Sequence, residues 1–161
     1  MLVSNSSTII LIAKATLLSK FLDSVKNVTI TKVIHDEIIK KDSFENLSIK
    51  KEIEKGRIKV EIVDDRLYLT TLKHFKLDEG EASAFALLQE RKYNGILTDD
   101  KELIKLCKIE DIKFTSAMAV VVKLFKKRII NKTEALEKIE KLQGYGRYSN
   151  ELYNYYKNMV K

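Results

Sequence analysis

The chain has 161 residues and a formal net charge of +7, with 30 Lys and Arg against 23 Asp and Glu. This length supports one domain with one core, and the 45% hydrophobic content and the lack of proline exclude disordered, collagen-like and Pro-rich classes. One cysteine, Cys107, excludes an internal disulfide and fits a cytoplasmic protein, and no apolar run reaches the ~18 residues of a membrane span, so no membrane contact is expected.

The first third of the chain predicts two strands and three helices. Residues 2–4 are a short apolar run typical of a strand, and a helical pattern follows through residue 21. Residues 28–31 predict a second strand. Residues 33–41 and 44–55 then show helical patterns, and Gly56 ends the second of these.

The middle of the chain continues this alternation. Residues 58–63 alternate and are rich in β-branched side chains, which predicts a strand. Residues 66–75 are ambiguous and could form a helix. Residues 80–91 carry an apolar stripe typical of a helix, and a strand at 95–98 and a helix at 101–108 follow.

The last third predicts a strand at residues 112–115 and helices at 116–128, 131–142 and 150–160. Strands therefore alternate with helices almost throughout, which favours an α/β fold: a three-layer α/β/α sandwich around a parallel sheet of about four to five strands. We expect two parts, a domain over 1–142 and a basic, Tyr-rich helical extension over 143–161.

The positive charge is concentrated near the C-terminal end. Residues 1–119 carry 20 basic and 19 acidic side chains, whereas residues 120–161 carry 10 basic and 4 acidic ones and five of the seven tyrosines. Cations bind phosphates and aromatic rings stack on bases, so this segment predicts an anionic partner such as nucleic acid. The alternative is a solvated helix face, with tyrosines that pack into the body or against a second copy.

Polar residues follow the predicted strands, at the edge where open parallel sheets bind ligands. Asn5 follows the first strand, and Glu37 lies one turn into the helix after the second. Asp99 and Asp100 follow the fourth strand, and Glu81 opens the helix before it. A cluster of carboxylates is costly to keep ionised without a cation, and Mg²⁺ or Mn²⁺ prefers oxygen ligands. The pattern therefore predicts a metal-dependent phosphodiesterase site.

The same residues have a structural interpretation. Polar side chains at these positions also cap helices, singly or as capping boxes. The candidates for such caps are Asn5 or Ser6, Asp78 with Glu81, and Asp99 with Glu102. Glu37 could lie on a solvated helix face.

Several segments, in this order, resemble the motifs of PIN-domain proteins. Residues 2–14 resemble their opening strand and leucine-rich helix, and residues 33–37 resemble their V-x-x-E segment. Residues 77–84 resemble the L-D-x-G-E-x-x-A signature of one prokaryotic subgroup, and residues 96–103 resemble the T-D-D block. Residues 114–116 stand where the family often has a Gly-Thr pair.

This resemblance, which extends over roughly residues 2–142, implies a fold and an activity. PIN domains are α/β/α sandwiches, and many are Mg²⁺- or Mn²⁺-dependent ribonucleases. They include the VapC toxins of toxin–antitoxin pairs, which commonly form dimers. The resemblance thus implies RNA, a small antitoxin protein and a second copy of the chain as partners.

The resemblance also implies roles for individual residues. Glu37, Glu81 and Asp100 match the acidic catalytic and metal-binding positions, and Asp99 is an adjacent candidate. Asn5 matches the first acidic position, where Asp is usual; its carbonyl can still bind a cation, but one negative charge is lost, so we expect weaker metal affinity. The residues expected to hydrogen-bond a ligand carboxylate or the phosphate are Ser6, Thr98 and Ser116.

Two functions follow from these observations. The first is a metal-dependent endoribonuclease in which Mg²⁺ or Mn²⁺ activates a water molecule. The alternative is a non-catalytic module that binds nucleic acid or protein, because Asn5 stands where the usual first Asp is expected.

Overall fold

A computed structural model describes residues 1–90, 93–146 and 148–161. Within these residues, five strands form one parallel sheet with the order β3-β2-β1-β4-β5. The strands are β1 (Leu2–Ser4), β2 (Val28–Thr31), β3 (Ile58–Glu61), β4 (Gly95–Leu97) and β5 (Phe114–Thr115). The central strand is β1, in which Leu2 is in register with Val28 of β2 and with Gly95 of β4.

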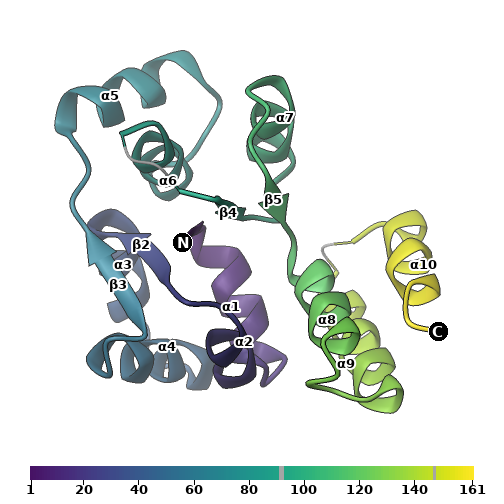
Figure 1. Ribbon diagram of the computed structural model, residues 1–161. Coiled ribbons are helices and arrows are strands. Elements are labelled where there is room, and N and C mark those ends of the chain that lie inside the picture. Colours follow the sequence, from purple (N-terminus) through teal and green to yellow (C-terminus); the bar gives the residue numbers. More distant parts are fainter. Residues whose placement is uncertain (91–92, 147) are drawn as a thin grey trace.

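Helices connect the strands and cover both faces of the sheet. In the described part of the chain they are α1 (Ser6–Lys14), α2 (Leu18–Ser24), α3 (Lys32–Ile39), α4 (Phe44–Glu54), α5 (Asp65–His74), α6 (Glu79–Glu90), α7 (Lys101–Ile109), α8 (Ala117–Lys126), α9 (Lys132–Gly144) and α10 (Asn150–Asn158). Figure 1 shows α5, α6 and α7 on one side of the sheet and α1, α2 and α4 on the other. The predicted three-layer α/β/α sandwich with a parallel sheet is therefore confirmed.

Side-chain caps explain where many of the helices begin. Residues 66–75 were ambiguous in sequence, but Asp64 accepts a hydrogen bond from the Leu67 backbone N (3.0 Å) and so starts α5. Asp99, a candidate cap in the structural interpretation, does not cap the helix after β4. Asp100 caps it instead, because its Oδ1 accepts from the Leu103 N at 2.8 Å.

The prediction of one helix through residue 21 is wrong, because this segment forms two helices, α1 and α2. Thr16 lies between them with a left-handed φ of 59°, which is uncommon for a β-branched residue. The Lys138 Nζ donates to the Thr16 Oγ1 at 2.8 Å and helps to hold this turn. The strands predicted at 58–63, 95–98 and 112–115 are shorter in the structure, where they are β3, β4 and β5. Residue 91 of the helix predicted at 80–91 lies outside the described residues.

The last helices lie together at one end of the molecule. Figure 1 shows α8, α9 and α10 as a group beside α1. Tyr148 and Val160 are buried there, with exposed fractions of 9% and 2%. None of the described helices is long and apolar enough to cross a membrane.

Candidate functional site

The carboxyl ends of β1 and β4 lie side by side at the middle of the sheet. The strand order runs from β1 through β2 to β3 in one direction and from β4 to β5 in the other. Such a reversal leaves a crevice beyond the strand ends, where open α/β sheets bind ligands. Asn5 directly follows β1, and its backbone N donates to the Leu97 carbonyl of β4 at 2.9 Å. Asn5 and the residues that follow Leu97 therefore lie at this switch point of the sheet.

Asn5 is almost fully buried, with 2% of its surface exposed. Its Oδ1 accepts from the Ser6 N at 2.9 Å, and its Nδ2 donates to the Ser7 Oγ at 3.4 Å. Asn5 thus caps α1, as its structural interpretation predicts. An amide oxygen has two lone pairs, so one acceptor position of Oδ1 remains beyond this bond.

Glu81 lies in the first turn of α6, next to other carboxylates. It forms a capping box with Asp78: the Glu81 N donates to Asp78 Oδ1 (2.8 Å), and the Asp78 N donates to Glu81 Oε2 (3.0 Å). Partial burial, together with the charges of Asp78 and Asp100, raises the pKa of Glu81 to about 7. Glu81 and Asp100, which come from different helices, therefore lie within the same negative field.

Glu37 of α3 reaches the start of α6. A Cβ at Gly80 would lie 3.0 Å from Glu37 Oε1 and 3.3 Å from Oε2, so the carboxylate fits there because residue 80 has no side chain. The pKa of Glu37 is raised, because the carboxylate loses water at this contact and lies near the charges of Asp78 and Glu79. A hydrogen bond with Ser6 acts in the opposite direction and lowers this pKa in part. The G-E pair of the sequence motif therefore positions two glutamates, Glu37 as well as Glu81.

Asp99 is bound by three parts of the protein. Its carboxylate accepts from Thr8 Oγ1 of α1 at 2.8 Å, from the Ala117 N of α8 at 3.2 Å and from the Tyr148 hydroxyl at 2.5 Å. Burial and the charge of Asp99 raise the pKa of this phenol. Sequence reasoning missed Thr8 and Tyr148, because no local pattern connects residues 91 and 49 positions apart.

Thr98 and Ser116, which were predicted as supporting residues, are both buried. The Thr98 Oγ1 accepts from the Asp100 N at 3.1 Å and so holds the backbone of that residue. The Ser116 Oγ caps α8 through the Ala119 N and donates to the Tyr156 hydroxyl, both at 3.1 Å. Thr98 therefore supports the acidic edge directly, whereas Ser116 connects α8 to α10.

The chemistry of this edge fits a divalent cation. The candidate side chains offer oxygen atoms, which Mg²⁺ and Mn²⁺ prefer. A cation would also relieve the repulsion from Asp78 and Asp100, which adds to burial in raising the pKa of Glu81. Within the described residues, no three His, Cys, Asp or Glu side chains are placed to hold one metal ion together. Glu81 and Asp100 form the acidic pair, Glu37 lies against Gly80, and Asp99 is held by Tyr148.

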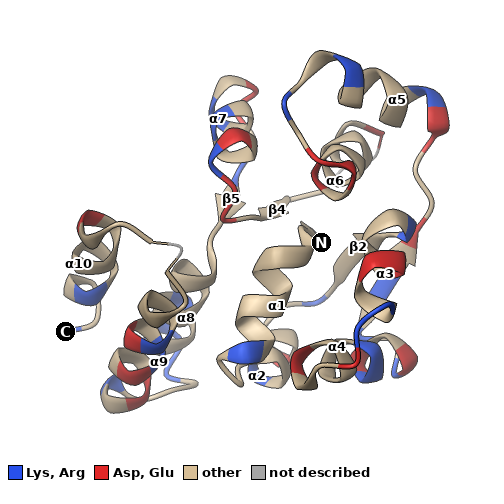
Figure 2. Ribbon diagram, turned by 180° about the vertical axis from the view of Figure 1, so that it is seen from behind, with Lys and Arg blue, Asp and Glu red and all other residues tan. Residues whose placement is uncertain are grey.

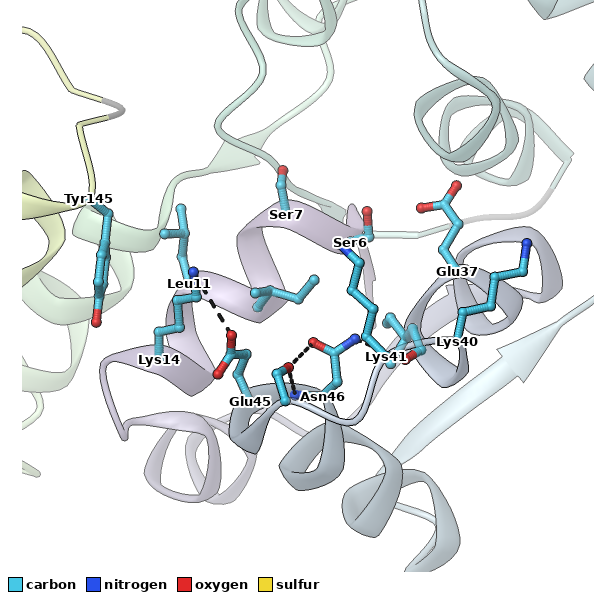
Figure 3. Close-up of a pocket in the computed structure, with 13 residues that line it drawn as sticks. Ser6, Ser7, Leu11, Lys14, Glu37, Lys40, Lys41, Glu45, Asn46 and Tyr145 are labelled. Carbon is cyan, nitrogen blue, oxygen red and sulfur yellow. Dashed lines mark hydrogen bonds and ion pairs between the residues drawn. The ribbon is translucent and has the colours of Figure 1, made fainter.

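A cavity of about 650 Å³ opens beside this edge (Figure 3). It shares Ser6 and Glu37 with the edge and extends between α1, the end of α3 and the start of α4. Its charged lining includes Lys14, Lys40 and Lys41. Figure 2 shows acidic segments at the starts of α6 and α7 and on α3, so a negative edge adjoins a cavity that is lined by these three lysines and by Glu37 and Glu45.

Comparison with protein families gives a match. A family model described as a PIN domain matches residues 1–160. Comparisons with curated proteins and with solved structures gave no match. The motifs, the parallel sheet and the acidic edge agree with this result, and the chain belongs to the PIN-domain family.

Proposed function

We propose that this PIN-domain protein is a ribonuclease that uses Mg²⁺ or Mn²⁺. One observation carries the proposal: Glu81 lies beside Asp78 and Asp100 at the switch point of the sheet, where partial burial and the charges of these two carboxylates raise its pKa to about 7. Glu81 and Asp100 would hold the cation, together with the free acceptor position of Asn5. When bound, the cation lowers the pKa of a water molecule and offsets the charge of the phosphate.

The other side chains of the edge have supporting roles in this proposal. Ser6 orients Glu37 beside Gly80, at the border of the metal site. Thr98 fixes the backbone of Asp100. Asp99 has one of two roles in this proposal. Its carboxylate either binds the cation directly or supports the acidic edge through its hydrogen bonds to α1, α8 and Tyr148.

The biological role that we propose is that of a toxin in a toxin–antitoxin pair. Its partners would be a small antitoxin protein and a second copy of the chain. Three apolar side chains at the end of α3 and the start of α4 are strongly exposed, which supports a contact between copies there. These are Ile39, Phe44 and Leu47, exposed by 44%, 68% and 50%.

The proposal is tested by titrating Mn²⁺ into the protein with a labelled RNA of mixed sequence. We expect cleavage that EDTA stops and that Asp100→Asn reduces by at least ~100-fold, the scale of losing one key electrostatic group. Asn caps helices as well as Asp does, so α7 should remain folded. Glu54→Gln, an exposed change on α4, is the matched control and should cleave normally.

A second readout does not depend on cleavage. Mn²⁺ should raise the unfolding temperature of the native protein, because a ligand that binds only the folded state stabilises it. Glu81→Gln should reduce that rise, whereas Glu54→Gln should not. Cleavage that survives both EDTA and Asp100→Asn would contradict the proposal.

The binding module is the second candidate, and the position of Asn5 favours it. The amide of Asn5 is used in capping α1 and brings no charge to the edge. In that case, Asn5→Asp should create Mn²⁺-dependent cleavage in a protein that otherwise has none. RNA binding that is unchanged by metal and by Glu81→Gln would favour this candidate over the nuclease.

A further inference from the structure

We infer that the cavity beside Glu37 is a groove for single-stranded RNA, with phosphates on Lys40 and Lys41 and a base on Tyr145. The inference rests on the proposed function, because it assumes that RNA binds at the acidic edge. It adds the residues that hold the RNA strand away from the site of cleavage.

The walls of the cavity come from three distant parts of the sequence (Figure 3). Helix α1 supplies Ser6 and Lys14, and the segment after α3 supplies Lys40 and Lys41. Tyr145, which directly follows α9, closes the side opposite Glu37. The volume of about 650 Å³ lies in the ~300–1,000 Å³ range of sites that enclose small ligands, so a nucleotide unit fits its scale.

The charges in the cavity favour an anionic ligand at one place. Lys14 is paired with Glu45 at 3.9 Å, so this cation is partly neutralised. Lys40 and Lys41 are exposed, and neither takes part in an ion pair recorded for the described residues. Two adjacent cations of this kind are suited to phosphates, and their positive charge is also what an RNA needs next to the carboxylate of Glu37.

Tyr145 supplies a surface for a base. Its exposed fraction is 37%, and the Lys14 Nζ lies 5.2 Å from the centre of its ring. An aromatic ring beside cations stacks bases of single strands, whose faces are free, whereas the bases of a duplex are covered by their neighbours. An acidic peptide could use Lys40 and Lys41 but has no base for this ring, so the aromatic wall favours RNA.

The groove is continuous with the proposed cleavage site. Ser6 and Glu37 line the cavity, and both also belong to the acidic edge. A strand whose phosphate lies at that edge would therefore place its next nucleotides along Lys40 and Lys41, toward Tyr145. The groove holds the RNA, and the carboxylates act on it.

The test measures binding of a short labelled single-stranded RNA in EDTA, where cleavage by a metal-dependent site is absent. Tyr145→Leu should weaken binding about tenfold, the scale of one lost base stack, whereas Tyr145→Phe keeps the ring and should bind normally. Lys40→Gln with Lys41→Gln should flatten the dependence of log K on log salt by about 1.4, since each phosphate contact contributes about 0.7. Lys51→Gln with Lys59→Gln removes the same charge outside the cavity and should change the slope much less.

Two results would overturn the inference. The first is native affinity and an unchanged salt slope in both groove variants. The second is a polyglutamate peptide that binds more tightly than RNA. If this binding disappears in the Lys40→Gln, Lys41→Gln variant and is unchanged in Tyr145→Leu, the groove is a site for an acidic peptide. If the groove variants behave as expected but Mn²⁺ produces no cleavage in the native protein, the proposed nuclease fails and the groove stands.

Discussion

Among single residues, Gly80 connects the sequence motif most directly to the acidic edge. The carboxylate of Glu37 occupies the space that a side chain at position 80 would fill. The glycine is therefore required by a close approach and not by an unusual backbone angle. Its neighbour Glu81 has a raised pKa of about 7, because burial and the charges of two carboxylates act on it together.

We expect Gly80→Ala to separate activity from stability. The new Cβ would lie 3.0 Å from Glu37 Oε1 and displace that carboxylate, and a sub-ångström displacement at a catalytic edge should slow cleavage about tenfold. Alanine favours the helix over glycine, so the free energy of unfolding should stay within ~1 kcal/mol. RNA cleavage assays measure the loss of activity, and urea unfolding measures the free energy of unfolding. Gly144→Ala, whose Cβ would meet nothing within 4 Å, is the control and should cleave normally.

Glu81 predicts a specific pH dependence of stability. Its pKa is about 7 in the folded protein against an ordinary value of 4.5, so the unfolded state loses this proton first as the pH rises. The native protein therefore loses stability between these two values. Glu81→Gln keeps the acceptor oxygen for the Asp78 N but cannot ionise.

In metal-free buffer, the unfolding free energy of Glu81→Gln should rise relative to the native protein from pH about 5 to about 8, and then level off. Denaturant titrations at several pH values measure this difference. A difference that stays constant with pH would mean that Glu81 is not destabilised by its neighbours. Glu54→Gln serves again as the control, because Glu54 is exposed on α4.

At the scale of elements, Asp99 connects α1, α8 and the segment before α10 through Thr8, the Ala117 N and Tyr148. We expect Tyr148→Phe to lower the free energy of unfolding by ~1.5–3 kcal/mol, the range for a hydrogen bond to a charged group. Chemical denaturation measures this change. Tyr155→Phe is the matched control, since Tyr155 is 58% exposed, and equal stability losses in the two variants would contradict a special role for Tyr148.

The elements also show what local sequence can predict. Apolar and β-branched runs that end at polar residues such as Asn5 predict the strands of the sheet, and the apolar stripe that begins at residue 80 predicts α6. The break at Thr16 was missed because neither glycine nor proline marks it, and a distant lysine supports it. Asp99 is also a candidate helix cap in the sequence, because two adjacent aspartates offer the same local signal, and only the packed structure shows that Asp100 is the cap.

The candidate site was predictable to a similar degree. Parallel strands bring their carboxyl ends to one edge, so the proximity of Glu81 and Asp100 followed from topology. The proximity of Tyr148 to Asp99 did not, because it depends on how the last helices pack. The roles of these residues in metal binding and catalysis stay predictions, which the Mn²⁺ experiments address.

For the whole molecule, the division into residues 1–142 and 143–161 also stays a prediction, and it can be tested by ending the chain at residue 142. The deletion removes Tyr148 and Val160, which are 9% and 2% exposed, and uncovers parts of α8 and α9. We expect a loss of more than ~3 kcal/mol, the scale of removing a buried aromatic side chain. A shortened chain that unfolds in urea with the native midpoint and cooperativity would instead support two independent parts.

The central position of β1 has a consequence for the order of events during synthesis. Strand β1 is synthesised before β4, which follows some ninety residues later, so the side of β1 that pairs with β4 stays unpaired until then. The acidic edge is completed by Asp100, and Tyr145 leaves the ribosome later still. If the groove works as inferred, a growing chain acquires its carboxylates before it can hold RNA against them. A nascent nuclease surrounded by ribosomal RNA would therefore stay weak until Tyr145 has emerged from the ribosome.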